Sequence, residues 1–184
     1  PVFPSLIRDL AQLREVGIRI LIVPGARERI DEILDLYGVE NRMGESVRIS
    51  SSDAMPFIKM AAFDVANRIM TLLTGNGMSA VIGNWVRART LGVVDGIDYM
   101  STGKVERIHT DKLNDLLDDN VIPIFPCIGW SSTGEPYNVS SNELSSVLAQ
   151  AVSADKLFFV SQKSRDWPSR LTIEEVDGFL DAGG

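Results

Sequence analysis

Residues 18–23, with the sequence IRILIV, restrict the possible fold more than any other part of the chain. The run is short, rich in β-branched residues and without regular polar alternation, which is typical of a strand covered on both faces. An apolar stripe at helical spacing precedes it and ends at Gly17, and Gly25 turns the chain into a second helix. Helix, buried strand, glycine turn and helix in succession predict an α/β domain with a largely parallel sheet.

The alternation of helices and strands continues along the chain. Residues 86–108 are an exception, because Asp95-Gly96 and Thr102-Gly103 separate short alternating pieces, as in hairpins. We predict one three-layer α/β domain over residues 1–184, with helices on both faces of a mostly parallel central sheet. Its strands are expected near residues 18–23, 80–85, 121–125 and 156–160, with the first and third in the same sheet.

The composition narrows the classes of function. Hydrophobic residues make up 45% of the 184 positions and charged residues 23%, which is ordinary for a globular protein. A net charge of −7 argues against a surface for nucleic acid or an anionic membrane. Cys127 is the single cysteine and is expected to be a small core residue, so the chain forms no internal disulfide and a cytoplasmic location is expected. The sequence has no apolar run of bilayer length and no metal-ligand spacing, so we expect no membrane partner and no metal site.

Residues 135–144, EPYNVSSNEL, form a polar loop ahead of a helix. The N-terminus of a helix is a favourable place for an anion, so the loop has the layout of a phosphate site. Phosphoryl transfer depends on charged groups that organise the phosphate and its metal, yet this loop offers the uncharged side chains of Asn138 and Asn142. The sequence therefore indicates a phosphate site that lacks its acid.

Several segments in this order resemble the amino-acid kinase family, which has the fold of acetylglutamate kinase. They are GIRILIVPGARERIDEIL, VRISSSDA, GNWVRARTLGVVDGIDYMSTGKVERI, VIPIFPCIGWSSTGEPYNVSSNEL and ADKLFFVS, and the resemblance covers roughly residues 5–161. Within the family the chain is most similar to the kinase-like domain of N-acetylglutamate synthases. Its PGAR turn resembles their HGAR turn, where the kinases carry three glycines. LGVVDGIDYMSTGKVERI and GEPYNVSSNEL also resemble the corresponding stretches of the synthases.

The resemblance accounts for the missing acid. Asn142 stands where the kinases carry the aspartate that organises the transferring phosphoryl group, and it cannot supply the same charge. Ala26 and Arg27 stand where glycines let backbone amides close on a phosphate. The family's first strand, with its phosphate-contacting Lys-Gly-Gly segment, is also missing from this sequence. We therefore expect no catalytic residue in this chain and no phosphoryl transfer.

The resemblance implies a different activity for the parent polypeptide. Such synthases join this domain to a C-terminal acetyltransferase domain, which transfers the acetyl group of acetyl-CoA to L-glutamate in the first step of arginine biosynthesis. The chain is then a fragment, silent by itself, with acetyl-CoA bound outside it. The kinase-like domain is expected to bind arginine and to support a homo-oligomer. The position of the arginine site, and whether arginine inhibits or activates, stay open. Two alternatives remain, namely an active acetylglutamate kinase and a binding-only module of the same fold.

Three residues are candidates for binding acetylglutamate or glutamate. Arg48 matches the family arginine that holds the ligand carboxylate, although it could equally be a surface arginine paired with Glu45 or Asp53. Asn138 matches a ligand-contacting asparagine, and asparagine is also common in turns. Gly25 could present a backbone amide to the ligand or simply form a tight turn. Arg27 is expected to be a solvated charge on the face of its helix.

Overall fold

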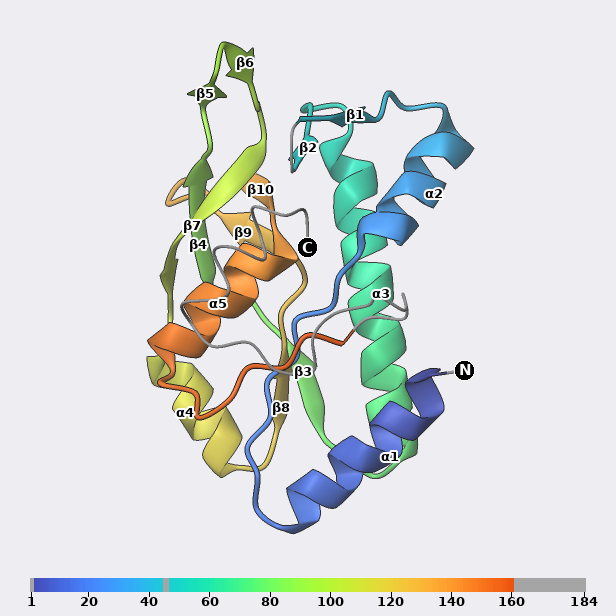
Figure 1. Ribbon diagram of the computed structural model, residues 1–184, viewed down its shortest axis with the longest axis vertical. Coiled ribbons are helices and arrows are strands. Elements are labelled where there is room, and N and C mark those ends of the chain that lie inside the picture. Colours follow the sequence, from blue (N-terminus) through green and yellow to red (C-terminus); the bar gives the residue numbers. More distant parts are fainter. Residues whose placement is uncertain (1, 45–46, 161–184) are drawn as a thin grey trace, which may run out of the picture.

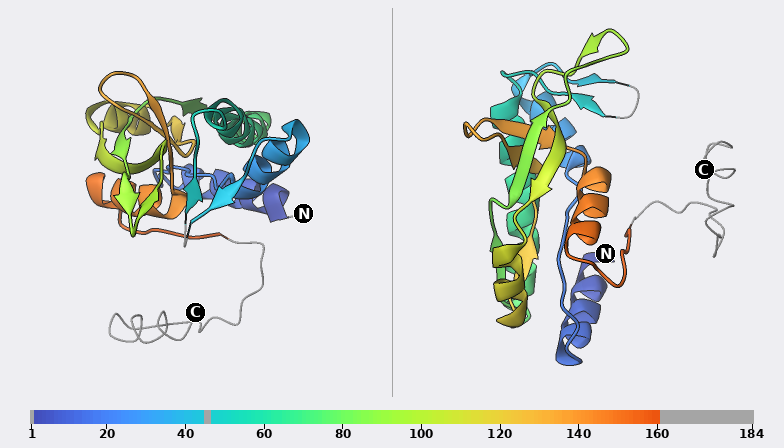
Figure 2. Two further views of the ribbon diagram at one scale, coloured as in Figure 1. Left: turned by 90° about the horizontal axis from the view of Figure 1, so that it is seen from above. Right: turned by 90° about the vertical axis from the view of Figure 1, so that its left-hand side faces the viewer.

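The computed structural model describes residues 2–44 and 47–160, which are arranged in layers (Figure 1). The described helices are α1 (Val2–Glu15), α2 (Arg27–Tyr37), α3 (Met55–Gly75), α4 (Asp111–Asp118) and α5 (Ser141–Ala151). In the side view of Figure 2, α3 and α4 lie on one side of the central strands, and α1 and α5 lie on the other. Helices therefore cover both faces of the sheet, as predicted.

The central sheet is parallel. β3 (Ala80–Ile82) pairs in parallel with β8 (Ile122–Ile124). Ile22 extends this sheet through a parallel bridge to Ile124, flanked by backbone hydrogen bonds of 3.0 and 2.8 Å. The first and third predicted strands thus lie in the same sheet, which confirms that part of the prediction. The predicted strand at 18–23 is reduced to the single bridge at Ile22.

The prediction of a fourth strand at residues 156–160 is wrong. The chain after α5 has no strand pairing up to Val160, and Phe158 and Phe159 are 75% and 62% exposed. A strand exists through hydrogen bonds to a neighbouring strand. Within the described ranges no segment pairs with these residues, so their apolar sequence alone does not produce a strand.

A small closed barrel stands next to the parallel sheet. Its strands, in spatial order, are β10 (Pro136–Val139), β7 (Thr102–Ile108), β4 (Val86–Thr90) and β9 (Ile128–Trp130). β4 and β7 are antiparallel, as the predicted hairpin requires, whereas β4 and β9 are parallel. A Cβ atom on Gly129 would lie only 2.5 Å from the Cβ of Ala88, so glycine is what lets β9 approach β4 and close the barrel.

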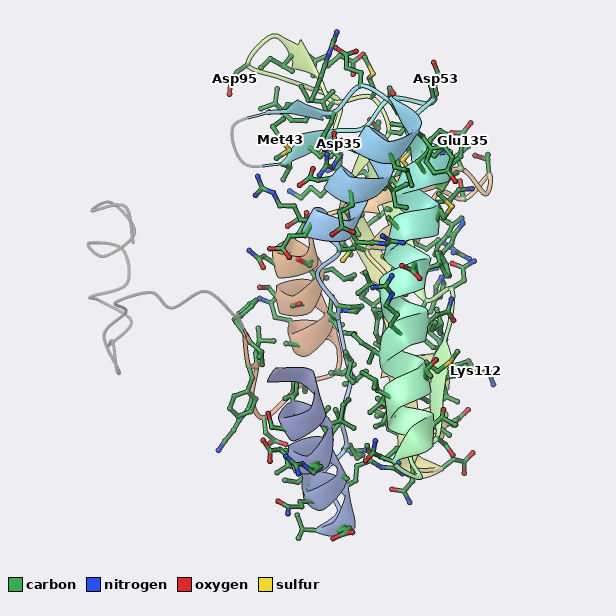
Figure 3. All side chains as sticks on the ribbon, turned by 90° about the vertical axis from the view of Figure 1, so that its right-hand side faces the viewer. Asp35, Met43, Asp53, Asp95, Lys112 and Glu135 are labelled. Atoms are coloured by element: carbon green, nitrogen blue, oxygen red, sulfur yellow. The ribbon has the colours of Figure 1, made fainter. Side chains whose placement is uncertain are left out.

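Two short hairpins lie at one end of the molecule. They are β1 (Arg42–Met43) with β2 (Arg48–Ile49), and β5 (Val93–Val94) with β6 (Ile97–Asp98). Asp95 and Gly96 have φ angles of 50° and 78°, which confirms the predicted turn. Thr102 and Gly103 begin β7 instead of forming a second turn. Figure 3 shows Met43 and Asp95 at this end of the molecule and Lys112 toward the other end.

The core fills the spaces between these layers. Phe125 is fully buried and its ring centroid lies 5.1 Å from that of Trp85. Ile7 of α1 packs with the α3 residues Ile69 and Leu73 against the parallel sheet. None of the described helices is both long and apolar enough to span a membrane. The described residues also contain no group of three or more His, Cys, Asp or Glu side chains that could hold a metal ion.

Candidate functional site

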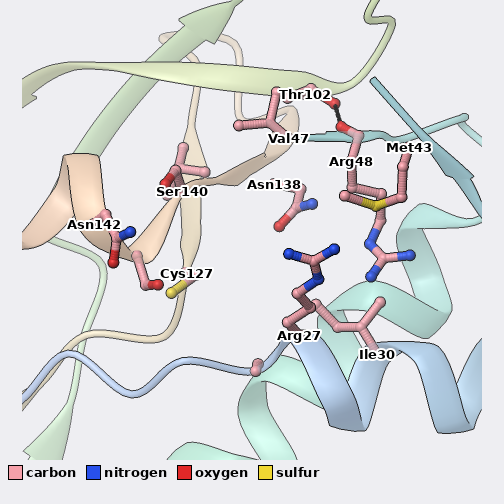
Figure 4. A pocket seen from close by; sticks show the side chains of 13 residues that line it. Arg27, Ile30, Met43, Val47, Arg48, Thr102, Cys127, Asn138, Ser140 and Asn142 are labelled. Carbon is pink, nitrogen blue, oxygen red and sulfur yellow. Dashed lines mark hydrogen bonds between the residues drawn. The ribbon is translucent and has the colours of Figure 1, made fainter. Parts of the chain in front are cut away.

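A pocket of about 200 Å³ lies between the N-terminal ends of α2 and α5, with residues of β2 and β10 in its walls (Figure 4). The residues that line it are Ala26, Arg27, Ile30, Met43, Val47, Arg48, Thr102, Cys127, Asn138, Val139, Ser140, Ser141 and Asn142. The fold therefore brings Arg48, Asn138 and Asn142 together, although the first is about ninety residues from the other two. Gly25 is not in this lining and lies next to it, directly before Ala26.

Arg48 is a buried cation with fixed partners. It is 6% exposed, and its Nη2 atom lies 2.7 Å from Oδ1 of Asp31. Its Nη1 atom donates to Oδ1 of Asn41, and Nδ2 of Asn41 donates to the same Asp31 oxygen at 2.6 Å. The alternative that Arg48 is a surface arginine is wrong, because Arg48 is buried and its partner is Asp31. Asp53 is not the partner, and Glu45 lies outside the described residues.

The carboxyl group of Asp31 is held in its ionised form. Partial burial favours the protonated form and pushes its pKa up, but hydrogen bonds from Arg48 and Asn41 act in the opposite direction. The positive charges of Arg48 and Arg27 add to these bonds, so the pKa lies below the ordinary value of 3.8. Asp31 is therefore the counterion that fixes the guanidinium of Arg48 at the pocket wall.

This ion pair is expected to make stability depend on pH in the acid range. A carboxyl group whose pKa is lower in the folded than in the unfolded state stabilises the fold above the unfolded pKa, and this contribution is lost as pH falls through the folded pKa. The difference in free energy of unfolding between the protein and Asp31→Asn should thus be largest at neutral pH and shrink below the ordinary value of 3.8. Urea unfolding of both proteins at a series of pH values measures this difference, and a difference independent of pH would contradict the assignment.

A buried polar network positions Asn138. Its Nδ2 atom donates to Oγ of Ser50 at 3.0 Å, and Ser50 is fully buried. Thr102 bonds to the same hydroxyl at 3.2 Å, accepts the Ser50 backbone N–H at 3.0 Å and donates to the carbonyl oxygen of Arg48. One cluster of hydroxyl groups therefore ties β2, β7 and β10 together. Because Ser50 accepts the hydrogen bond from the amide nitrogen of Asn138, the amide oxygen of Asn138 faces the pocket.

The two helices at the pocket begin without side-chain caps. The N-cap residues are Ala26 for α2 and Ser140 for α5, and neither forms a side-chain hydrogen bond to its helix. Asn142 lies in the first turn of α5, where it contributes no charge. Unpaired N–H groups and the helix dipole make each of these ends electropositive. The positive ends of both helices face the same space.

Cys127 lines the pocket as a neutral thiol. It is 5% exposed, and its sulfur donates to the carbonyl oxygen of Pro24 at 3.2 Å. Burial raises the pKa of the thiol to about 12, although a hydrogen bond with Ser141 acts to lower it. The prediction that Cys127 is a core residue is confirmed, because it packs within an apolar cluster.

Two residues of the site have roles that the sequence did not predict. Arg27 is exposed at the first position of α2, as expected of a solvated helix-face charge, and it also lines the pocket. The sequence feature that could have indicated this role is the Gly25 turn just before Arg27. That turn directs the start of α2 toward the loop that precedes α5. Asp31 was not a candidate at all. Nothing in its sequence neighbourhood indicates a pairing with a residue seventeen positions away.

Comparisons with known proteins identify the family. A sequence model described as the amino acid kinase family matches residues 2–164. The chain belongs to this family. A protein of Streptococcus mutans, smu.665, has the same fold, with a TM-score of 0.85 at 22% identity over 96% of this chain and 76% of that one. The central parallel sheet and the flanking helices are thus those of the amino acid kinase fold.

Relatives within the family are acetyltransferases by name. The amino-acid acetyltransferase of Pasteurella multocida is 35% identical over 162 residues, which cover 85% of this chain and 37% of that protein. The amino-acid acetyltransferase of Escherichia coli is 32% identical over 164 residues, covering 84% of this chain and 37% of that protein. The chain therefore spans little more than a third of the length of these relatives.

Solved structures of one such enzyme also match. N-acetylglutamate synthase from Neisseria gonorrhoeae complexed with coenzyme A and N-acetyl-glutamate has a TM-score of 0.71 at 27% identity, over 82% of this chain and 35% of that one. The same enzyme complexed with coenzyme A and L-arginine has a TM-score of 0.70 at 26% identity, over 82% of this chain and 37% of that one. Both acetylglutamate and arginine are thus ligands of a relative with this fold.

Proposed function

We propose that this chain is the kinase-like regulatory domain of an N-acetylglutamate synthase. The parent polypeptide then acetylates L-glutamate from acetyl-CoA, which binds outside this chain, and serves the first step of arginine biosynthesis. The observation that carries this proposal is the similarity to amino-acid acetyltransferases over 84% or more of the chain, in a domain whose phosphate loop carries Asn142 in place of an acid. A cytoplasmic location and a homo-oligomer are part of the proposal.

The regulatory part of the proposal is arginine sensing. Its support is the arginine complex of the Neisseria gonorrhoeae enzyme, which shares the fold of this chain. The test is an acetyl-transfer assay on the whole polypeptide that carries this chain, in which release of free coenzyme A is followed with L-glutamate in the presence and absence of L-arginine. We expect glutamate-dependent release whose rate arginine changes. A polypeptide without glutamate-dependent release, or one indifferent to arginine, would refute the proposal.

The pocket is the second part of the proposal. In this proposal Arg48 binds a carboxylate of acetylglutamate or glutamate, and the amide oxygen of Asn138 accepts an N–H of the ligand. Both residues line the pocket, and the amide nitrogen of Asn138 donates to Ser50, which supports these roles. The backbone at Gly25 adjoins the same space at the start of α2. An anionic ligand suits these electropositive surroundings, in which two helices begin.

Phosphoryl transfer is expected to be absent. A coupled assay of ADP release with acetylglutamate and ATP should show no turnover above the blank, whereas working kinases reach roughly 1 to 100 per second. Asn142→Asp is the matched variant, because it restores the acid alone. It should remain inactive, since Ala26 and Arg27 still replace the glycines that would surround the phosphate. Turnover at kinase rates by the unmodified chain would favour the alternative of an active acetylglutamate kinase.

A further inference from the structure

Arg27 is a cation that lines the pocket and has no hydrogen-bonded partner among the described residues. In Figure 4 its guanidinium and the amide of Asn138 point toward one another across the pocket. Within residues 2–44 and 47–160 it takes part in no hydrogen bond or ion pair. Arg29, two positions further along the same helix, pairs with Glu32 at 2.9 Å and with Asp64 at 2.8 Å. Arg29, which does not line the pocket, is thus bonded to two carboxylates, whereas Arg27 acts on Asp31 through its charge without forming an ion pair.

The position of Arg27 favours an anion in the pocket, although Arg27 is exposed to solvent and its charge also acts on Asp31. It occupies the first position of α2, where the helix dipole already presents positive charge. The uncapped start of α5 presents a second positive helix end to the same space. The pocket lining contains Arg27 and Arg48 and no carboxylate. Positive charge from four sources therefore meets in one small cavity. The carboxylate of Asp31 lies outside the lining and is already bonded to Arg48.

Arg48 alone cannot account for this concentration of charge. Asp31 already bonds to its Nη2 atom and Asn41 to its Nη1 atom, so the donors that remain suit a single carboxylate. A second carboxylate on the same ligand requires a second cation, and Arg27 is the unpaired cation of the lining. The amide oxygen of Asn138 can accept a hydrogen bond from a ligand N–H, because the amide nitrogen of Asn138 donates to Ser50 Oγ.

We propose that Arg27 is a specificity-determining residue, which makes the pocket select a ligand with two carboxylates and an amide N–H, an N-acylated acidic amino acid. The inference rests on the proposed function, from which acetylglutamate is the ligand tested. It also predicts that the pocket discriminates against free arginine. The cationic side chain of free arginine is repelled from this pocket, so arginine does not compete here with the dicarboxylate.

The test compares two ligands that differ in one charge. Isothermal titration of the full chain is carried out with N-acetyl-L-glutamate and with N-acetyl-L-glutamine, which replaces the side-chain carboxylate with an amide. We expect the chain to prefer acetylglutamate by about tenfold or more, because a charge-assisted hydrogen bond is lost with the amide. Arg27→Gln should weaken acetylglutamate binding by about the same factor and leave acetylglutamine binding unchanged, which abolishes the preference.

Arg89→Gln is the control, because it removes the same charge from an exposed position of β4 that does not line the pocket. It should retain the full preference. Titration of acetylglutamate in increasing concentrations of L-arginine should show no competitive displacement. The proposal is overturned if the chain binds neither ligand, if Arg27→Gln keeps the preference, or if arginine displaces acetylglutamate competitively. None of these results affects the acetyl-transfer assay, so the proposed function and this inference can fail separately.

Discussion

Replacing Arg48 with methionine is expected to damage both ligand binding and the fold. Acetylglutamate should bind about ten- to a hundredfold more weakly, because each charge-assisted hydrogen bond to a carboxylate contributes about 1.5 to 3 kcal/mol. The free energy of unfolding should fall by about 2 kcal/mol, because Asp31 and Asn41 lose their shared partner. The loss stays moderate because the Asp31 side chain is 40% exposed and can be rehydrated.

Arg42→Met is the matched control for this experiment. Arg42 lies on β1 of the same hairpin, is exposed, and pairs with Glu40 at 2.7 Å at the surface. Its replacement should change the free energy of unfolding by less than about 1 kcal/mol and leave the affinity unchanged. Urea unfolding and isothermal titration give the two quantities. Arg48→Met with the stability and affinity of the unmodified chain would show that the buried ion pair has neither role.

Phe125→Ala should produce the largest loss of stability. The phenyl ring is fully buried against Trp85, next to the point where Ile22 joins the parallel sheet. Truncation of such a ring leaves a cavity and costs about 3 to 5 kcal/mol. Phe158→Ala is the control, since Phe158 is 75% exposed and should change stability by about 0.5 kcal/mol or less. Equal losses for the two variants in urea unfolding would contradict the assignment of the core.

The sequence was sufficient to predict the parts of the fold that depend on neighbouring residues. Helices with an apolar stripe and the Asp95-Gly96 turn depend on local patterns, and the structure contains them. The run at 18–23 was expected to be a buried strand, but its residues are exposed or half-buried and only Ile22 is bridged to the sheet. The barrel depends on pairing between β4 and β9, which are some forty residues apart, and no local pattern specifies that pairing. Residues 156–160 have the composition of a strand, but composition cannot supply a pairing partner.

The candidate site could be predicted only in part for a similar reason. Arg48 and Asn138 were found through the resemblance to a family, and the structure places both in one pocket. The residues that hold them, Asp31 and Ser50, were missed because their contacts join segments that are distant in the sequence. Charged and hydroxyl residues of this kind look like ordinary surface positions until the fold brings them to their partners.

The bridge between Ile22 and Ile124 has a consequence for synthesis of the chain on the ribosome. The segment at Ile22 leaves the ribosome before its partner, because the strand that pairs with it follows about a hundred residues later. At typical rates of roughly 5 to 20 residues per second, the apolar run at 18–23 must wait on the order of 5 to 20 seconds for its partner. During that interval its hydrophobic side chains are exposed, and long-range pairings of this kind also form slowly once both partners are available. Nascent chains arrested before residue 124 should therefore be the ones that chaperones bind and proteases cut.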